Sequence, residues 1–129
     1  GLDHDDSSVF ERTYRFLMDA AISVPRVHIL TPVPGTPLYE ELRAADRIVS
    51  TDFGRYSGGQ VVYQPRHFAP ADLQANYWRL YERLFTLPAI WHRAGRNRAR
   101  LEPFMRGVVW AVNLHYRNHV RHRINPGIV

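Results

Sequence analysis

Three histidines near the C-terminal end have the spacing of a metal-binding set. His115, His119 and His122 occur at i, i+4 and i+7, so a helix would carry their imidazoles along one face, where they could bind zinc or nickel. No acidic ligand follows nearby, and the neighbouring Arg117 and Arg121 would repel a cation. We therefore interpret this segment as a basic helix and predict no metal site.

Carboxylates occur close together at two places in the first third of the chain. Three aspartates and one histidine occupy residues 3–6, a set that could bind a divalent cation. Aspartate is also favoured just before a helix by the helix dipole, and that interpretation is preferred here. Glu40 and Glu41 fall in a first helical turn and point in different directions. The sequence thus predicts no catalytic residue.

The 129 residues contain no cysteine. This excludes a disulfide, a cysteine nucleophile, a thiolate zinc site and an iron–sulfur cluster held by these residues alone. The sequence also has no Gly-x-Ser-x-Gly elbow, Walker loop or dinucleotide-binding glycine pattern. The sequence therefore gives no sign of a serine-elbow hydrolase, a P-loop nucleotide-binding protein or a dinucleotide-binding enzyme.

All 17 basic side chains are arginine, and they are unevenly placed. Residues 1–65 hold nine acids and six arginines, whereas residues 66–129 hold three acids and eleven arginines. A basic module that clamps phosphates is therefore an alternative hypothesis, with nearby Tyr and Trp stacking on bases. The arginines concerned are Arg93, Arg96, Arg98, Arg100, Arg106, Arg117, Arg121 and Arg123. Because no RNA-binding signature occurs, we predict no specific nucleic-acid partner.

The elements in the first half are predicted from capping residues and periodicity. Apolar residues recur at helical spacing over residues 8–22, which predicts a helix that ends before Pro25. Residues 26–31 form a short β-branched run closed by Pro32, which predicts a strand. Thr36 at the N-cap and Pro37 at the first helical position predict a helix from residue 37.

The second half is predicted to be mostly helical. A glycine-containing loop at 46–59 leads to a short strand at 60–64, and a strong apolar stripe predicts a helix over 70–86. A short helical piece begins at Pro88, and helical periodicity resumes over 101–124. If 26–31 is a strand, it must pair with 60–64 or with another chain; otherwise it loses strand form.

Neither the first six residues nor the apolar content of the chain predicts a secreted or membrane-spanning protein. Residues 1–6 have neither the basic nor the apolar region of a signal peptide, and the longest apolar stretch, 104–116, is shorter than a membrane span. We expect a cytoplasmic protein. The amphipathic segment 101–124 leaves open a peripheral contact with an anionic membrane surface.

Two stretches of sequence resemble the radical S-adenosylmethionine superfamily, and more narrowly its cobalamin-binding branch. Gly1-Leu2-Asp3-His4-Asp5-Asp6 resembles the end of the fifth barrel strand in these proteins, and Leu30-Thr31-Pro32-Val33-Pro34-Gly35-Thr36-Pro37-Leu38-Tyr39 resembles the turn after the sixth. Residues 46–86 resemble their helical C-terminal extension. The resemblance extends to about residue 92 and is most specific over 30–39.

The resemblance implies an α/β fold that is mostly helical. Residues 1–45 would be the last helix and strand of a partial (β/α) barrel, and residues 46–129 a helical C-terminal extension with the short strand at 60–64. The chain would then be the C-terminal fragment of a larger enzyme, inactive alone because the cluster-binding cysteines lie elsewhere. Its partner would be the rest of the parent barrel or another copy of the chain.

The resemblance also implies cofactors for the parent enzyme, namely S-adenosylmethionine, a four-iron four-sulfur cluster and cobalamin, none bound by this chain alone. Gly1 and Asp3 would approach the adenosyl group, and the backbone of Leu30, Thr31 and Pro32 would lie under the adenine. At the family's usual acidic position this chain has His4. The substrate, a small molecule or a lipid, is not readable from these residues.

Overall fold

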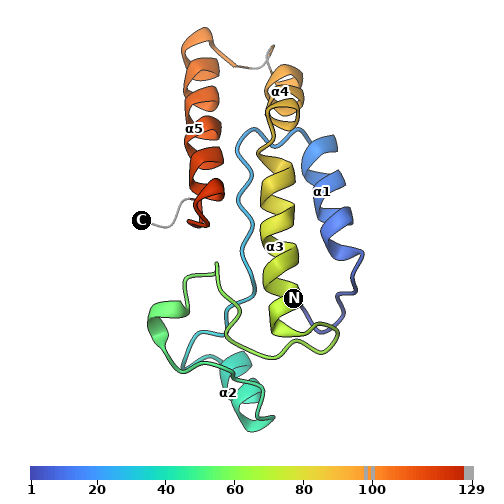
Figure 1. Cartoon of the computed structure of the whole chain (residues 1–129), viewed down its shortest axis with the longest axis vertical. Coiled ribbons are helices and arrows are strands. Elements are labelled where there is room, and N and C mark those ends of the chain that lie inside the picture. Colours follow the sequence, from blue (N-terminus) through green and yellow to red (C-terminus); the bar gives the residue numbers. More distant parts are fainter. Residues whose placement is uncertain (98, 100, 127–129) are drawn as a thin grey trace. The chain divides into compact units, whose positions relative to one another are not determined.

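The computed structural model describes residues 1–97, 99 and 101–126, and these are predominantly helical. The elements are α1 (Val9–Asp19), α2 (Pro37–Ala44), the 3-10 helix η1 (Phe53–Arg55), α3 (Pro70–Leu84), α4 (Leu87–Arg96) and α5 (Pro103–Arg121) (Figure 1). No strand forms among the described residues. The expected α/β class is therefore corrected to a helical one.

Two of the helices begin at threonine caps followed by proline. The Thr36 hydroxyl accepts a hydrogen bond from the N–H of Tyr39 at 3.3 Å, and Pro37 opens α2, which confirms the predicted start. Thr86 caps α4 in the same way, accepting from the N–H of Ala89 at 3.4 Å. The hydroxyl satisfies an otherwise unpaired N–H in the first turn, and proline lacks the N–H that would be left over.

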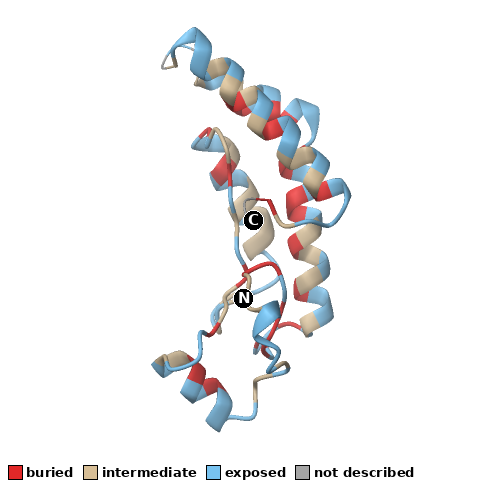
Figure 2. Ribbon diagram, turned by 90° about the vertical axis from the view of Figure 1, so that its left-hand side faces the viewer, coloured by how far each residue is buried: buried red, intermediate tan, exposed pale blue. Residues whose placement is uncertain are grey.

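The chain divides into two compact units that do not follow sequence order. Unit 1 contains Gly1–Val9 and Val27–Tyr77, and unit 2 contains Phe10–Arg26 and Trp78–Val129. Helix α3 contributes its first half to unit 1 and its second half to unit 2. Its predicted apolar stripe is confirmed by the burial of Leu73, Tyr77, Leu80 and Leu84, none more than 3% exposed (Figure 2).

The predicted strand at 60–64 is wrong as a strand, although its residues are mostly buried. Tyr63 forms a single antiparallel bridge with Ile48, and the Gln64 N–H donates to the Arg47 carbonyl at 2.7 Å. The partner is therefore the sequence-near segment 47–49. One bridge with its flanking bonds is too short to make a ladder.

The predicted strand at 26–31 is also wrong. Its residues are extended and pair with no strand among the described residues; the Ile29 N–H donates to the Gly58 carbonyl at 2.8 Å, and the Tyr77 hydroxyl donates to the Val27 carbonyl at 3.4 Å. A strand without a neighbouring strand has no ladder to define it. The third alternative considered above, loss of strand form, is the one observed.

The apolar face predicted for the last helix is correct only in part. Val109 and Val120 are buried as expected, but Phe104 is 79% exposed, and Asn113 is 1% exposed although it is polar. Phe104 precedes Asn113 by two and a half helical turns and therefore lies on the opposite face of α5. The buried hydrogen bonds of Asn113, described below, determine which face of the helix is covered.

Candidate functional site

The N-terminal residues predicted to approach a cofactor are held by side chains of unit 1. The Leu2 N–H donates to the Asp5 carboxylate at 2.7 Å, and the Gly1 carbonyl accepts a hydrogen bond from the hydroxyl of Tyr63. A Cβ at Gly1 would lie 2.8 Å from that hydroxyl and 3.0 Å from Leu73. A side chain at position 1 would therefore require Tyr63 or Leu73 to shift.

Asp3 is paired with two arginines. Arg47 approaches its carboxylate with two nitrogens, at 2.6 and 2.9 Å, and Arg66 approaches at 2.8 Å. These hydrogen bonds, chiefly those of Arg47, lower the pKa of Asp3 from 3.8 to about 2, and Asp3 in turn raises the pKa of Arg47. Asp3 is thus an anion that is already neutralised, and its carboxylate is occupied rather than open to a ligand.

The second predicted segment lies beside Gly58. Gly58 has a φ of +77°, and a Cβ there would lie 2.7 Å from Nδ1 of His28. Leu30 and Thr31 are partly exposed, whereas Pro32 is fully buried. The main-chain groups of His28, Leu30 and Thr31, apart from contacts within the segment itself, have no hydrogen-bond partner in the described part of the chain. Part of this extended segment is therefore an open edge.

The two predicted cofactor segments belong to the same unit but have separate partners. Gly1 and Asp3 are held by Tyr63 and the two arginines, while 28–32 is held through Ile29 to Gly58. The sequence did not indicate the roles of Tyr63, Arg47 or Arg66. Opposite charges so far apart in the chain carry no local spacing signal. The predicted cofactor contacts of Gly1, Asp3, Leu30, Thr31 and Pro32 remain predictions.

The centre of unit 2 is organised by a buried arginine. Arg93 of α4 is 0% exposed and donates to the Leu84 carbonyl at 2.7 Å and to Asn113 Oδ1 at 3.1 Å, and also reaches Sδ of Met18. Asn113 donates to the Ser23 carbonyl at 2.9 Å. Burial lowers the pKa of Arg93 to about 10.

The guanidinium of Arg93 therefore caps the C-terminal end of α3. It satisfies the carbonyl of Leu84, the last residue of α3, and no carboxylate of the described chain accompanies it. Its Nε has no partner among the same residues. Arg93 thus cannot belong to the predicted phosphate-binding set, because it is sealed from solvent.

The remaining arginines of that set also have different environments. Arg123 is paired with Glu82 at 2.9 Å and lies over the Trp78 ring, and Arg106 donates through Nε to the Leu101 carbonyl at 2.9 Å. Arg96 and Arg121 are exposed, and Arg117 is half-buried. Arg98 and Arg100 lie outside the described residues. Nucleic-acid binding stays an untested alternative with fewer available cations than the sequence suggested.

The three histidines lie in or directly after α5, and only two of them are neighbours in the described structure. The rings of His115 and His119 are 4.1 Å apart between centroids, whereas Nδ1 of His122 lies 2.8 Å from the Asn118 carbonyl. No group of three potential metal ligands is found within residues 1–97, 99 and 101–126. In the same part of the chain, no helix combines the length and apolar character needed to cross a membrane.

Comparison with known proteins identifies two enzymes similar to part of this chain. The bacteriochlorophyllide d C-12(1)-methyltransferase of Chlorobaculum tepidum is 32% identical over 93 residues, which cover 72% of this chain and 20% of that protein. The anaerobic magnesium-protoporphyrin IX monomethyl ester cyclase of Cereibacter sphaeroides is 28% identical over 97 residues, covering 75% and 16%. No family model matches, and no solved structure matches significantly.

The chain therefore spans about a fifth or less of the length of the curated relatives it matches. Both relatives are radical S-adenosylmethionine enzymes, which supports the resemblance at that level, at modest identity and over part of the chain. The matched length exceeds one motif and includes most of this chain. The comparison supports a relationship to such enzymes over about three quarters of this chain.

Proposed function

We propose that these residues form the C-terminal part of a radical S-adenosylmethionine enzyme of the cobalamin-binding type. The carrying observation is the similarity of about three quarters of this chain to two enzymes that are several times longer. In such enzymes an iron–sulfur cluster supplies the electron that cleaves the sulfonium of S-adenosylmethionine. With no cysteine here, the cluster ligands would come from outside these 129 residues, and this chain alone would not catalyse.

The open edge of residues 28–31 supports a place for this segment in a larger sheet. Unpaired main-chain donors and acceptors on an extended segment are satisfied most directly by a neighbouring strand. Ile29 is buried and already bonded to Gly58, so the segment is held in position within unit 1. We infer that the rest of the parent barrel supplies the missing neighbour.

For the cofactor contact, we propose that the partly exposed residues Leu30 and Thr31 meet the adenine through their main chain, with Pro32 as a rigid support. Pro32 is fully buried and lacks an N–H, so it contributes shape rather than a hydrogen bond. Gly1 and Asp3 would contribute main-chain atoms. The Asp3 carboxylate does not fit a free ribose acceptor, because Arg47 and Arg66 already occupy it.

The names of the two relatives specify different reactions, a methyl transfer and a ring closure, on cyclic tetrapyrroles. We extend this to a proposed substrate class: the parent of this chain acts on a cyclic tetrapyrrole. Cobalamin, itself proposed as a cofactor, would be a second large ring for the parent to bind.

The first test is the parent enzyme itself. The longer reading frame should encode a Cys-x-x-x-Cys-x-x-Cys loop, and the anaerobically reconstituted product should convert S-adenosylmethionine to 5′-deoxyadenosine, measured by chromatography. The 129-residue chain treated identically should form none. A reading frame without the cysteine triad, or a reconstituted parent that leaves S-adenosylmethionine intact, would refute the proposal.

The second test addresses the adenine contact in that parent. Replacing Leu30 by Trp should weaken S-adenosylmethionine binding at least about tenfold by filling the space beside the main chain. Val33→Trp is the matched control, because Val33 is 57% exposed and lies just past the segment. Visible absorption checks that each variant keeps its cluster. Equal affinities for the two variants would remove Leu30 from the cofactor site.

A further inference from the structure

A pocket of about 420 Å³ lies within unit 2, between α4 and α5. Its lining consists of Trp91, Ala94, Gly95, Leu101, Arg106, Val109 and Trp110. Neither the sequence resemblance nor the comparisons assign a role to it. Its size falls within the range of small-molecule sites, about 300–1,000 Å³.

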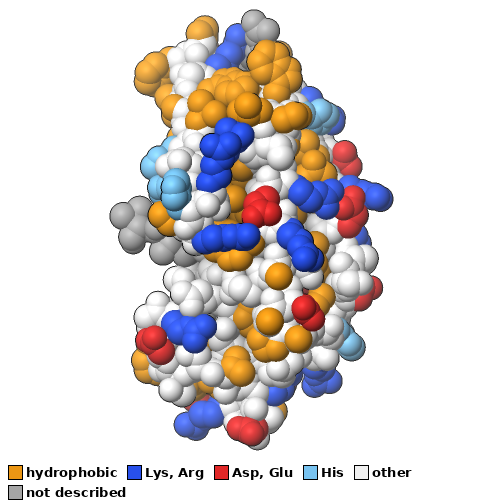
Figure 3. Space-filling view, viewed as in Figure 1, with side chains coloured by type: hydrophobic (Ala, Val, Ile, Leu, Met, Phe, Trp, Pro, Cys, Tyr) orange, Lys and Arg blue, Asp and Glu red, His pale blue; other side chains and the backbone are white. Residues whose placement is uncertain are grey.

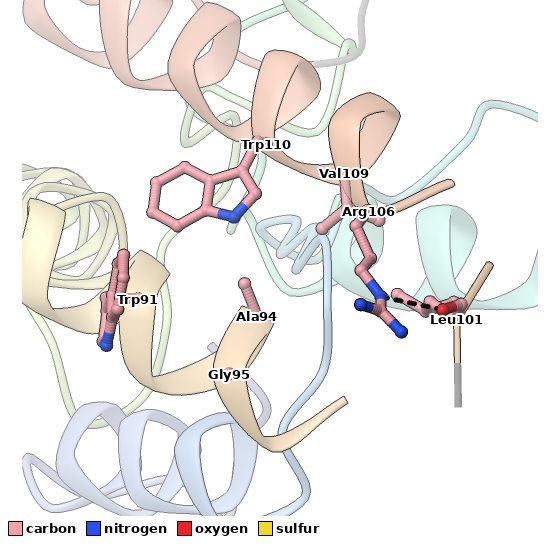
Figure 4. A pocket seen from close by; sticks show the side chains of 7 residues that line it. All are labelled: Trp91, Ala94, Gly95, Leu101, Arg106, Val109 and Trp110. Carbon is pink, nitrogen blue, oxygen red and sulfur yellow. Dashed lines mark hydrogen bonds between the residues drawn. The ribbon is translucent and has the colours of Figure 1, made fainter. Parts of the chain in front are cut away.

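One end of the pocket is aromatic. The rings of Trp91 and Trp110 lie 5.7 Å apart between centroids at an interplanar angle of 63°, an edge-to-face pair formed across the two helices (Figure 4). A tryptophan that packs in a protein core is mostly buried, whereas the side chain of Trp91 is 70% exposed. The two indoles therefore present ring surface to the space between the helices.

The other end of the pocket is cationic. Figure 4 shows Arg106 on the side opposite the indoles, with Ala94 between them. Its Nε donates to the Leu101 carbonyl at 2.9 Å, and no carboxylate of the described chain pairs with the guanidinium. This hydrogen bond orients the group while its two terminal nitrogens remain available. Two guanidinium N–H groups match the two oxygens of a carboxylate in a bidentate pair.

The small residues make room between the two ends. A Cβ at Gly95 would meet no atom within 4 Å, and Ala94 has only a methyl group. We propose that this pocket binds a planar aromatic carboxylate, with its ring against Trp91 and Trp110 and its carboxylate on Arg106. The proposal goes beyond the radical-enzyme function and does not depend on it.

Exposed apolar side chains continue beyond the pocket, and they supply a built-in comparison. Figure 3 shows hydrophobic side chains gathered over the region of α4 and the start of α5, in the upper part of the view. Phe104, 79% exposed, lies on α5 but does not line the pocket. A ligand that only adsorbs to apolar surface would use Phe104 as readily as Trp91, whereas a ligand seated in the pocket would not.

The test uses 2-naphthaleneacetate and its neutral amide, 2-naphthaleneacetamide, titrated into the whole chain by calorimetry. The acid should bind at one site with a dissociation constant of about 0.1–1 mM, as expected for so small a ligand, and about tenfold more tightly than the amide. Arg106→Gln should remove that preference. Arg96→Gln, an exposed arginine of α4 outside the pocket, should leave it unchanged.

The aromatic end is tested by a second pair of variants. Trp91→Ala should weaken both compounds several-fold, and Phe104→Ala should weaken neither. Because both side chains are mostly exposed, the two variants should remain folded, as checked by circular dichroism. In a heteronuclear NMR titration, the indole N–H signals of Trp91 and Trp110 should shift and that of Trp78 should not.

Several results would overturn the pocket proposal. They are absence of saturable binding, equal affinity for acid and amide, or equal losses in Trp91→Ala and Phe104→Ala. A concentration-dependent dimer that disappears in Trp91→Ala would assign the same surface to self-association instead. Each leaves the radical-enzyme proposal untouched, since that proposal is judged by S-adenosylmethionine cleavage in the parent.

Discussion

At the scale of single residues, the chain uses arginine for three different tasks. Arg47 neutralises Asp3, Arg93 caps the end of α3 from inside unit 2, and Arg106 lies at the edge of a pocket. The sequence presents all of them as one uniform basic character. Charge composition therefore describes how many cations exist but not which of them face solvent.

The Asp3 carboxylate should make stability depend on pH in acid. Its pKa is lowered to about 2 in the folded chain, so the folded state binds the proton less readily than the unfolded state. The stabilisation is fully present above about 4 and is lost as the pH falls toward 2. Because Asp3 is 31% exposed, we expect only about 1 kcal/mol.

Urea unfolding at a series of pH values would measure this effect. Asp3→Asn should flatten the decline in unfolding free energy between pH 4 and 2. Asp19→Asn, at an exposed carboxylate of α1, serves as the control and should keep the wild-type slope. The same slope in Asp3→Asn as in the wild type would show that the pairing with Arg47 and Arg66 contributes nothing.

Arg93 should be among the most sensitive positions of the chain. Arg93→Met leaves the Leu84 carbonyl and Asn113 Oδ1 buried without a donor, which should cost about 2–4 kcal/mol of unfolding free energy. Arg96→Gln, on the exposed side of the same helix, should change stability by less than about 0.5 kcal/mol. Chemical denaturation followed by circular dichroism compares the two.

A double variant separates hydrogen bonding from packing at this site. Adding Asn113→Leu to Arg93→Met removes both members of the Arg93–Asn113 hydrogen bond, so the double loss should be smaller than the sum of the two single losses, although the carbonyls of Leu84 and Ser23 still lack their donors. If the double variant were less stable than the sum of the two single changes predicts, the Arg93–Asn113 hydrogen bond would not be the coupling element.

At the scale of elements, the helices were predicted well because their signals are local. Thr36 and Pro37 define the start of α2, and an apolar residue every three or four positions defines the buried face of α3. The strands were predicted wrongly because a strand exists only through its neighbour. Residues 26–31 have the β-branched composition of a strand, but nothing in their own sequence supplies a partner.

The close approach of Gly58 to the His28 side chain of the extended segment 26–31 can be tested by substitution. Gly58→Ala places a methyl group 2.7 Å from His28 in a left-handed conformation and should cost about 2–3 kcal/mol. Gly35→Ala is the matched control, because Gly35 has a φ of +83° but nothing within 4 Å, and it should cost about 1 kcal/mol. The difference between the two losses measures the contact alone.

Removing the neighbouring ring checks that interpretation. In a His28→Ala background, the stability lost through Gly58→Ala should fall toward that lost through Gly35→Ala. The reason is that the ring atoms of His28 nearest the new methyl group are gone. An undiminished loss would assign the whole effect to backbone strain at residue 58.

At the scale of the whole molecule, the basic half of the chain should bind nucleic acid only weakly. Arg96 and Arg121 are exposed to solvent, whereas Arg93 is buried and Arg123 is paired with Glu82. We expect sequence-indifferent binding to single strands with a dissociation constant of about 10⁻⁴–10⁻⁶ M that weakens steeply with salt. Fluorescence anisotropy over a salt series measures it.

Charge removal then discriminates between surface attraction and a built site. Replacing Arg96 and Arg121 by Gln should reduce the log–log salt slope by about 0.7 for each phosphate that these side chains no longer neutralise. Nanomolar binding that depends on nucleotide sequence would instead favour the nucleic-acid module over the enzyme fragment.

The helices, their caps, the absence of cluster-binding cysteines and the similarity to radical enzymes follow from residue types and short spacings, so the residues alone predict them. The burial of Arg93, the pairing of Asp3 with Arg47 and Arg66, and the pocket lined by Trp91, Trp110 and Arg106 become visible in the folded chain and not before. Those relations join residues far apart in the chain or on different helices. The Arg93 contacts follow from the need of buried polar groups for hydrogen-bond partners, and none of these three relations has a periodic trace in the sequence.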